Sequence, residues 1–206
     1  MNIRNKALPF PSKFIDKTVT DPLQVYQAFD YAETKPEIHT IVIDTLTYLM
    51  DMFENQYVLK ASNTMKGWSE YAQFFQNLMQ DKVAKSTKNV IFLAHTMDVL
   101  NESEMVSETL VKVKGSLMNK GVESAFTTVI STKKMPISKL EGFSNDYLNI
   151  TPEEESIGIK YVFQTGITKE TVNERMRSPL KMWSQQETYI DNDLQHVIDR
   201  LHKYYS

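Results

Sequence analysis

The sequence predicts an α/β fold with a mostly parallel sheet flanked by helices. Apolar, β-branched runs at 38–43 and 89–94 have the composition of strands that are buried on both faces. Amphipathic patterns at 23–33 and 68–85 alternate with these runs, so a strand, a helix and a strand follow one another as a βαβ unit. At 206 residues the chain is expected to form a single domain over 1–206.

Each element of the first half follows from a local signal. Asp21-Pro22 predicts a helix start, with Asp21 as the N-cap and Pro22 at the first helical position. The first apolar run ends at Asp44, and the second is followed by His95. The remaining patterns predict a helix at 46–52, a loop or frayed helix at 54–66 and an amphipathic helix at 68–85.

The second half of the chain is more irregular. Its patterns predict, in order, a partly alternating segment at 107–113, a short helix at 115–124, a strand at 126–132, a loop at 136–156, a strand at 158–167 and a terminal helix at 193–205.

Composition excludes several classes of site. The chain has no Cys, which excludes disulfides, cysteine-based zinc sites and thiol catalysis, and a cytoplasmic protein is expected. No apolar run approaches the roughly 18 residues of a membrane helix. None of the six glycines is followed by Lys, so these residues contain no G-x-x-x-x-G-K-[ST] loop of the kind that cradles nucleotide phosphates.

The most informative motif is Thr40-Ile-Val-Ile-Asp44-Thr45. An Asp at the C-terminal end of a buried strand lies at the sheet edge where ligands bind in open α/β folds. In nucleotide-hydrolysing P-loop proteins such a carboxylate holds the Mg²⁺ of the nucleotide. The alternative is that Asp44 only caps the following helix.

The second strand run, Val90-Ile-Phe-Leu-Ala-His95-Thr96, ends in a polar residue. At this position His95 is a candidate sensor of the terminal phosphate, which passes the signal to the following loop. The alternative is a His that is satisfied by a neighbouring backbone group. A metal role is not expected, because no second His lies nearby in the sequence.

Residues 110–140 form a basic segment. Their charged residues give a local net charge of +5 and are Lys112, Lys114, Lys120, Lys133, Lys134, Lys139 and the single acid Glu123. A basic segment of this kind indicates binding along the phosphate backbone of a single strand. Trp68 or Tyr57 would then have to supply the stacking on the bases. The alternative is a solvated lysine face.

A later group of cations comprises Lys169, Arg175 and Arg177. Cations on a late connection are placed to reach the nucleotide of a neighbouring subunit, as arginine fingers do. A charged surface turn is the alternative.

Five stretches together resemble the phage-type RecA-like ATPases of the AAA/RecA P-loop class, and the similarity runs over nearly all 206 residues. They are Asn5-Lys-Ala-Leu-Pro-Phe10, Ile41-Val-Ile-Asp-Thr-Leu-Thr-Tyr-Leu-Met-Asp51, Val90-Ile-Phe-Leu-Ala-His-Thr96, Lys112-Val-Lys-Gly-Ser-Leu117 and Glu187-Thr-Tyr-Ile-Asp-Asn192. Proteins of this kind act in phage recombination as single-strand DNA-binding partners of annealing proteins.

The resemblance implies a RecA-like sheet, ATP and Mg²⁺ as cofactors, self-assembly and, for a phage protein, the cytoplasm of the bacterial host. Asp44 matches the Walker B carboxylate, with Thr45 beside it, and His95 matches the strand-end sensor. Residues 54–68, with Lys66, match the first DNA-facing loop. Lys112, Lys114 and Lys120 match the second, and Arg175 and Arg177 match cations that face a nucleotide.

The chain departs from the family in two places. The N-terminal strand, P-loop and helix that begin the family fold are absent, and Arg4 stands where members tend to carry an acidic residue. Three hypotheses follow: a relative that binds DNA or a partner without hydrolysing ATP alone, the larger part of a split ATPase, or an unrelated α/β binding or structural subunit. The first two are favoured jointly. Because the absent strand would leave an open sheet edge, pairing with another chain is expected.

Overall fold

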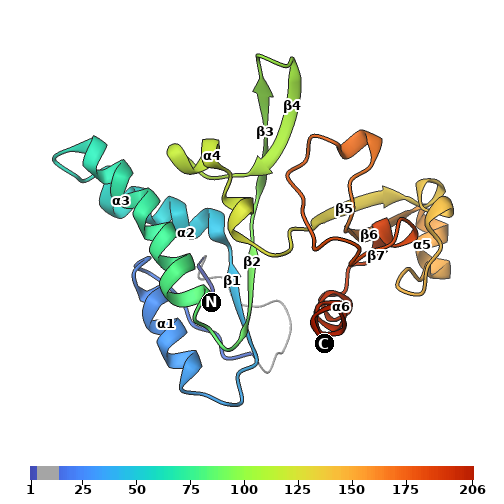
Figure 1. Ribbon diagram of the computed structural model, residues 1–206, viewed down its shortest axis with the longest axis horizontal. Helices are drawn as coiled ribbons and strands as arrows, with labels where there is room; N and C mark the ends of the chain where they lie inside the picture. Colours follow the sequence, from blue (N-terminus) through green and yellow to red (C-terminus); the bar gives the residue numbers. More distant parts are fainter. Residues whose placement is uncertain (4–13) are drawn as a thin grey trace. The chain divides into compact units, whose positions relative to one another are not determined.

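The computed structural model describes residues 1–3 and 14–206 (Figure 1). Arg4 and the Asn5-Lys-Ala-Leu-Pro-Phe10 stretch therefore lie outside the described residues. The chain divides into two compact units, one of Met1–Met97 with Val111–Val122 and one of Asp98–Leu110 with Glu123–Ser206. The predicted α/β class is confirmed. The single domain over 1–206 stays a prediction, because a compact unit is not by itself an independently folding domain.

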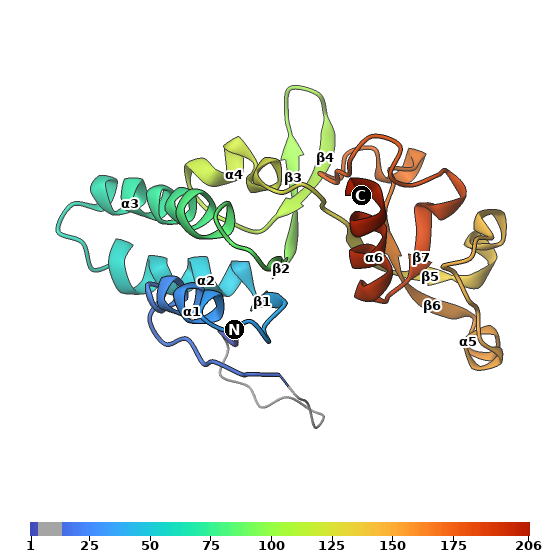
Figure 2. The same ribbon diagram turned by 60° about the horizontal axis from the view of Figure 1, so that its bottom comes forward.

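The first unit contains the predicted βαβ arrangement. Its elements are α1 (Gln24–Glu33), β1 (Thr40–Asp44), α2 (Leu46–Phe53), a π-helical turn (Glu54–Val58), α3 (Thr64–Asn77), a second π-helical turn (Leu78–Val83), β2 (Asn89–Leu93) and α4 (Ser116–Lys120). Strands β1 and β2 pair in parallel, with Thr40 opposite Asn89 and Asp44 opposite Leu93. Figures 1 and 2 show α1, α2 and α3 together on one side of this pair.

Burial in the first unit follows the pleat of β1. Ile41 and Ile43 are buried, whereas Val42 between them is only partly buried. Alternate side chains of a strand point to opposite faces, so one face of β1 carries the apolar core. The outer edge of β1 is occupied as well, because the main chain of Ile3 donates to the carbonyl of Asp44 at 2.9 Å.

Two helices and their π-helical turns form a hairpin beside the strands. Phe53 stacks on Phe74, with ring centroids 4.7 Å apart. Of the segment expected at 54–66 as a loop or frayed helix, Glu54–Val58 continues α2 by a π-helical turn, and residues 59–63 are irregular as expected. The helix α3 begins at Thr64, earlier than predicted, because the side chain of Asn63 accepts from the main-chain N–H of Lys66 at 3.1 Å and caps it.

Gly67 allows α3 to approach the π-helical turn after α2 closely. A Cβ atom at Gly67 would lie 3.0 Å from Cα of Val58, which is backbone and cannot move aside easily. We therefore expect Gly67→Ala to lower the free energy of unfolding by about 1–2 kcal/mol, despite the better helix propensity of Ala. Gly142→Ala is the matched control, because nothing lies within 4 Å of its Cβ position. Urea unfolding of both variants checks this, and equal stabilities would contradict it.

The second unit is built on antiparallel strands. Its elements are most of a hairpin of β3 (Thr96–Asn101) and β4 (Val106–Val111), then β5 (Ser131–Pro136), α5 (Pro152–Ile157), β6 (Ile159–Gln164), β7 (Tyr189–Asp191) and α6 (Leu194–Tyr205). Ser131 lies opposite Gln164, and Val162 lies opposite Asp191, both in antiparallel register. Parallel pairing of named strands is thus confined to β1 and β2 in the described chain.

Three elements of the second half differ from the expectation. The strand expected at 126–132 begins only at Ser131. The loop expected at 136–156 contains the start of α5, which Thr151 and Glu154 cap reciprocally. Strand β3 was not expected, because Asp98 and Asn101 interrupt its apolar alternation. The terminal helix expected at 193–205 is confirmed as α6.

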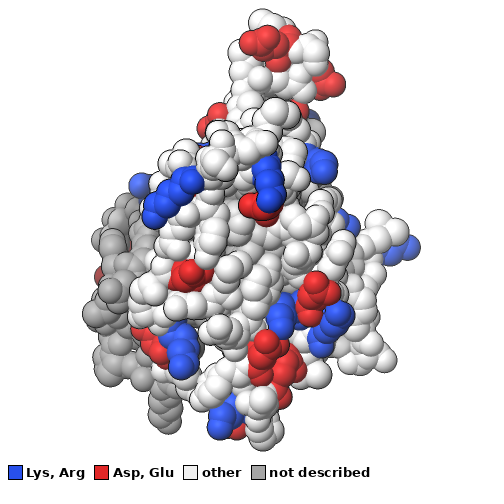
Figure 3. All heavy atoms as spheres, turned by 90° about the vertical axis from the view of Figure 1, so that its left-hand side faces the viewer, with Lys and Arg blue, Asp and Glu red and all other residues white. Residues whose placement is uncertain are grey.

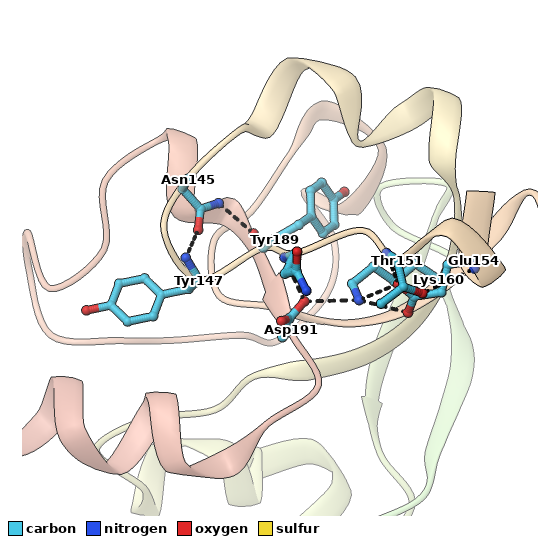
Figure 4. A network of polar contacts seen from close by, with 8 residues as sticks. Asn145, Tyr147, Thr151, Glu154, Lys160, Tyr189 and Asp191 are labelled. Atoms are coloured by element: carbon cyan, nitrogen blue, oxygen red, sulfur yellow. Dashed lines mark hydrogen bonds and ion pairs between the residues drawn. The ribbon is translucent and has the colours of Figure 1, made fainter.

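A buried lysine ties α5, β6 and β7 together (Figure 4). Lys160 is 6% exposed, and its Nζ donates to the two carboxylate oxygens of Glu154 at 2.8 and 3.0 Å. The same Nζ lies 3.0 Å from Oδ1 of Asp191. Asn145 donates to the carbonyl of Tyr189 at 3.0 Å and so fixes the adjoining loop. Burial pulls the pKa of Lys160 down, but the hydrogen bonds to Glu154 and Asp191 outweigh burial and raise its pKa.

This network predicts a pH dependence. The hydrogen bond from Lys160 holds the pKa of the Glu154 carboxyl below its usual value. A lowered pKa in the folded state contributes stability that is present above the unfolded pKa of about 4.3 and is lost as the pH falls through the folded pKa. We expect Glu154→Gln to be less stable at pH 7 and to lose less stability on acidification. Glu153→Gln, on the exposed side of the same helix, should follow the wild type in unfolding measured from pH 7 to pH 3.

None of the helices in the described residues is both long enough and apolar enough to cross a membrane.

Candidate functional site

Asp44 lies at the C-terminal end of β1, opposite the last residue of β2. Its side chain is exposed, and within the described residues its carboxylate has no hydrogen bond or ion pair. The helix that follows is capped by Thr45, whose Oγ1 accepts from the N–H of Tyr48 at 3.3 Å. Asp44 is therefore not used as the helix cap, which leaves its carboxylate available at the sheet edge.

His95 follows β2 at the same edge of the parallel pair. Its main-chain N–H donates to Oγ1 of Thr47 at 3.0 Å, and its carbonyl accepts from the N–H of Lys112 at 2.8 Å. The imidazole meets the ring of Tyr48 edge-on, with centroids 5.4 Å apart and planes at 87°. The main chain of His95 thus connects the helix after Asp44 to the start of the basic segment.

Thr47 and Tyr48 are site residues that the sequence did not single out. Thr47 is 3% exposed, so its hydroxyl is positioned by packing as well as by the hydrogen bond to His95. Both residues lie in the first turn of the helix that follows Asp44. That position, directly after a strand-end carboxylate, is the only sequence signal that marks them.

The residues around Asp44 fit a magnesium ion that is held mainly by a nucleotide. Within the described residues no group of three or more His, Cys, Asp and Glu side chains is arranged to hold a metal alone. Mg²⁺ keeps several waters and commonly takes one or two carboxylates together with substrate phosphates. The single open carboxylate of Asp44 matches this requirement and does not match a stand-alone metal centre.

Lys114 anchors the basic segment to the helical hairpin. Its Nζ lies 2.5 Å from Oε2 of Glu54 and 3.9 Å from Oδ1 of Asp51. Its main-chain N–H donates to the hydroxyl of Tyr71 at 3.2 Å. Burial raises the pKa of Tyr71 to about 12, so this hydroxyl stays neutral at physiological pH. Lys114 is therefore committed to intramolecular contacts.

Gly115 forms a second contact between the same segments. It has a φ of +60°, and a Cβ there would meet the indole of Trp68 at 3.1 Å. Trp68 in turn packs edge-on against Tyr71, with ring centroids 5.3 Å apart. The structure thus brings together the two segments, 54–68 and 112–120, that the family resemblance identifies as DNA-facing loops.

The other predicted DNA-binding lysines are exposed. Lys112 and Lys120 carry no ion pair within the described part of the chain. Lys66 lies in the first turn of α3, 3.6 Å from Glu70, and both side chains are largely exposed. Exposed pairs of this kind contribute little, so Lys66 can exchange Glu70 for another anion.

The later cations belong to the second unit, where two of them are held by polar contacts. Arg175 lies 3.0 Å from a carboxylate oxygen of Glu108, and Arg177 donates to the carbonyl of Ser124 at 2.9 Å. Lys169 lies exposed in a short 3₁₀ turn. Their expected reach toward a neighbouring subunit's nucleotide stays a prediction.

Comparison with known proteins gives one match. The profile of a family described as "AAA domain" matches residues 4–157, which is most of the chain. No curated protein and no solved structure matches it. The matched range includes Asp44, His95 and the lysines at 112–120.

Proposed function

The chain belongs to the AAA domain family, and we propose that it forms the magnesium-binding and DNA-facing part of a phage-type, RecA-like recombination ATPase. AAA proteins generally use ATP and Mg²⁺. The observation that carries the proposal is the main chain of His95, which bonds to Thr47 on one side and to Lys112 on the other. This arrangement joins the candidate nucleotide edge to the candidate DNA segment.

In this proposal the phosphates of ATP are held by a P-loop unit outside these 206 residues, in the same polypeptide or in a separate one. The outer edge of β2 supports this part. Within the described residues β2 pairs only with β1. Its apolar residues Val90 and Ile91 are only partly buried, and Leu93 is 45% exposed. A strand–loop–helix unit added at this edge would bury them.

Each site residue has a stated role. Asp44, with Thr45 beside it, would hold Mg²⁺ through water, and the ion would neutralise charge that develops on the phosphates. His95 would respond to the terminal phosphate. Lys66, Lys112 and Lys120 would bind phosphates of single-stranded DNA, whereas Lys114 holds the segment in place.

Arg175 and Arg177 would serve a nucleotide on a neighbouring copy. The protein would work as a homo-oligomer or together with the P-loop partner.

A second candidate is a non-catalytic α/β binding or structural subunit. It is favoured by the lack of a P-loop motif in the 206 residues. The two candidates differ in what stabilises the protein, because a ligand that binds only the folded state raises its melting temperature. We expect an oligo-dT single strand at low salt to raise the melting temperature of the chain. We expect ATP with Mg²⁺ to do so only when the P-loop unit is present. Unchanged melting temperatures in both arms would favour the structural subunit.

A further inference from the structure

The hairpin of β3 and β4 has one edge that is covered and one that is open. On the outer edge of β4, the N–H of Thr109 donates to the carbonyl of Asn173 at 3.1 Å, and the N–H of Arg175 donates to the carbonyl of Thr109 at 3.0 Å. Strand β3 pairs only with β4 within the described residues. Unpaired N–H and C=O groups along such an edge are a template for another strand.

This open edge is acidic and partly apolar. Residues 96–111 contain no Lys or Arg, and their charged residues are Asp98, Glu102, Glu104 and Glu108. Figure 3 shows acidic side chains gathered at the tip of the hairpin, at the top of the view. Leu100 on β3 is 59% exposed and Met105 in the turn is 78% exposed. The charge of the hairpin selects against a phosphate backbone and in favour of a basic partner.

The chain carries a second open edge of the opposite charge. Strand β5 is the outer strand of the β5–β6–β7 sheet and ends at Pro136, a residue that edge strands tolerate. Residues 124–140 contain no Asp or Glu, and their charged residues are Lys133, Lys134 and Lys139. Lys133 is held by Glu174 at 2.5 Å, whereas Lys134 is exposed and has no ion pair in the described structure.

We propose that β3 of one copy pairs with β5 of a second copy, antiparallel, with Asp98 opposite Lys134. Both strands have six residues, so this register pairs them over their full length. In this register the exposed residues of β3 lie opposite the exposed residues of β5. Thr96, Asp98 and Leu100 alternate on β3, and Pro136, Lys134 and Thr132 meet them from β5. An opposite-charge pair directly across antiparallel strands is favourable.

The proposed contact joins two different surfaces, so it is head-to-tail. Such contacts generate rings when the rotation between copies closes and open chains when it does not. Association would therefore pass beyond a dimer, and it would weaken with salt. The tests below use neither nucleotide nor DNA, so the failure of this contact and the failure of the proposed function are distinguishable.

Cross-linking tests the register directly, because the chain has no Cys of its own. Residues directly opposite across antiparallel strands have Cα atoms about 4.5–5.5 Å apart, within the span of a disulfide. A mixture of Leu100→Cys and Thr132→Cys proteins should give an oxidised heterodimer. A mixture of Leu100→Cys and Ser138→Cys proteins, with Ser138 beyond the end of β5, should give a several-fold lower yield of heterodimer. Equal yields from the two mixtures, or no heterodimer in the first, would overturn the proposal.

Charge reversal tests the pairing by rescue in nuclease-treated protein. Lys134→Glu should raise the dissociation constant from sedimentation velocity about ten-fold, and adding Asp98→Lys to the same chain should restore it. Lys203→Glu, which changes an exposed lysine of α6, should alter this dissociation constant little. Equal weakening by both single variants, or association that disappears with nuclease treatment, would contradict the contact. If Asp98→Lys disturbs the hairpin and the rescue fails for that reason, the cross-linking experiment decides the question, because it leaves both charges in place.

Discussion

Asp44→Asn is expected to lower the ATP turnover of the chain combined with its P-loop unit by about 10²–10³-fold. The substitution keeps the shape of the side chain and removes the charge that would hold Mg²⁺ against the phosphates. Removal of one electrostatic group of this kind typically lowers the turnover rate by about that factor. The side chain of Asp44 is exposed, and the interaction that the change would remove in the described residues is the attraction of its charge to the terminal amine of Met1. Stability should therefore change by less than about 0.5 kcal/mol.

Asp81→Asn is the control for Asp44→Asn. Asp81 is an exposed carboxylate whose ion pair, within the residues that the structure describes, is a surface contact with Lys85 at 3.0 Å. Its loss should leave turnover and stability near the wild-type values. Turnover of Asp44→Asn within a few-fold of the wild type, in protein that is folded and loaded with the P-loop unit, would remove Asp44 from the nucleotide site.

Reversing the charges of Lys112 and Lys120 to Glu is expected to weaken single-stranded DNA binding by about 100-fold or more at low salt. Each phosphate contact that is lost on a single strand removes about 0.7 of a counterion from the salt dependence, so the slope of log K against log salt should fall by about 1.4. Binding measured by fluorescence anisotropy at four salt concentrations gives both quantities. Lys169→Glu with Lys203→Glu, two exposed lysines of the second unit, is the matched pair that should leave the slope unchanged.

Lys114→Ala should behave differently from the other two lysines. The change removes the ion pair of Glu54, whose side chain is only 12% exposed. A carboxylate left without its partner in that position costs about 1–3 kcal/mol. We expect the melting temperature of Lys114→Ala to fall, whereas Lys112→Ala should leave it unchanged. DNA binding that weakens equally for both variants, with no loss of stability for Lys114→Ala, would show that Lys114 is a DNA contact like Lys112.

The parts of the fold that the sequence predicted correctly are those fixed by local patterning. β1 and β2 are largely apolar runs. β1 ends at Asp44, and His95 follows β2 by two positions, so their pairing and the placement of Asp44 and His95 followed from the pattern. The terminal helix followed from its regular apolar spacing. Strand β3 was missed because Asp98 and Asn101 interrupt the alternation of apolar residues that marks a strand. Its pairing with β4, which no local pattern contains, stabilises it.

The roles of the site residues depended on contacts that no local pattern contains. Lys114 and Glu54 are separated by 60 positions in the chain, so nothing in the basic run distinguished Lys114 from Lys112. The hydrogen bond between Thr47 and the main chain of His95 spans 48 positions. Thr45 and Asp44 are equally suited to cap a helix by residue type, and only the geometry shows that Thr45 does so.

We propose that Asp44 and His95 form half of a nucleotide site that a P-loop unit completes. The most direct test is steady-state ATP turnover of the chain mixed with a polypeptide that carries the P-loop strand and helix, with each component alone as reference. We expect Mg²⁺-dependent turnover for the mixture, stimulation of that turnover by single-stranded DNA, and no turnover for the chain alone. Turnover by the chain without a P-loop unit, or a stable complex that binds ATP and hydrolyses none, would contradict it.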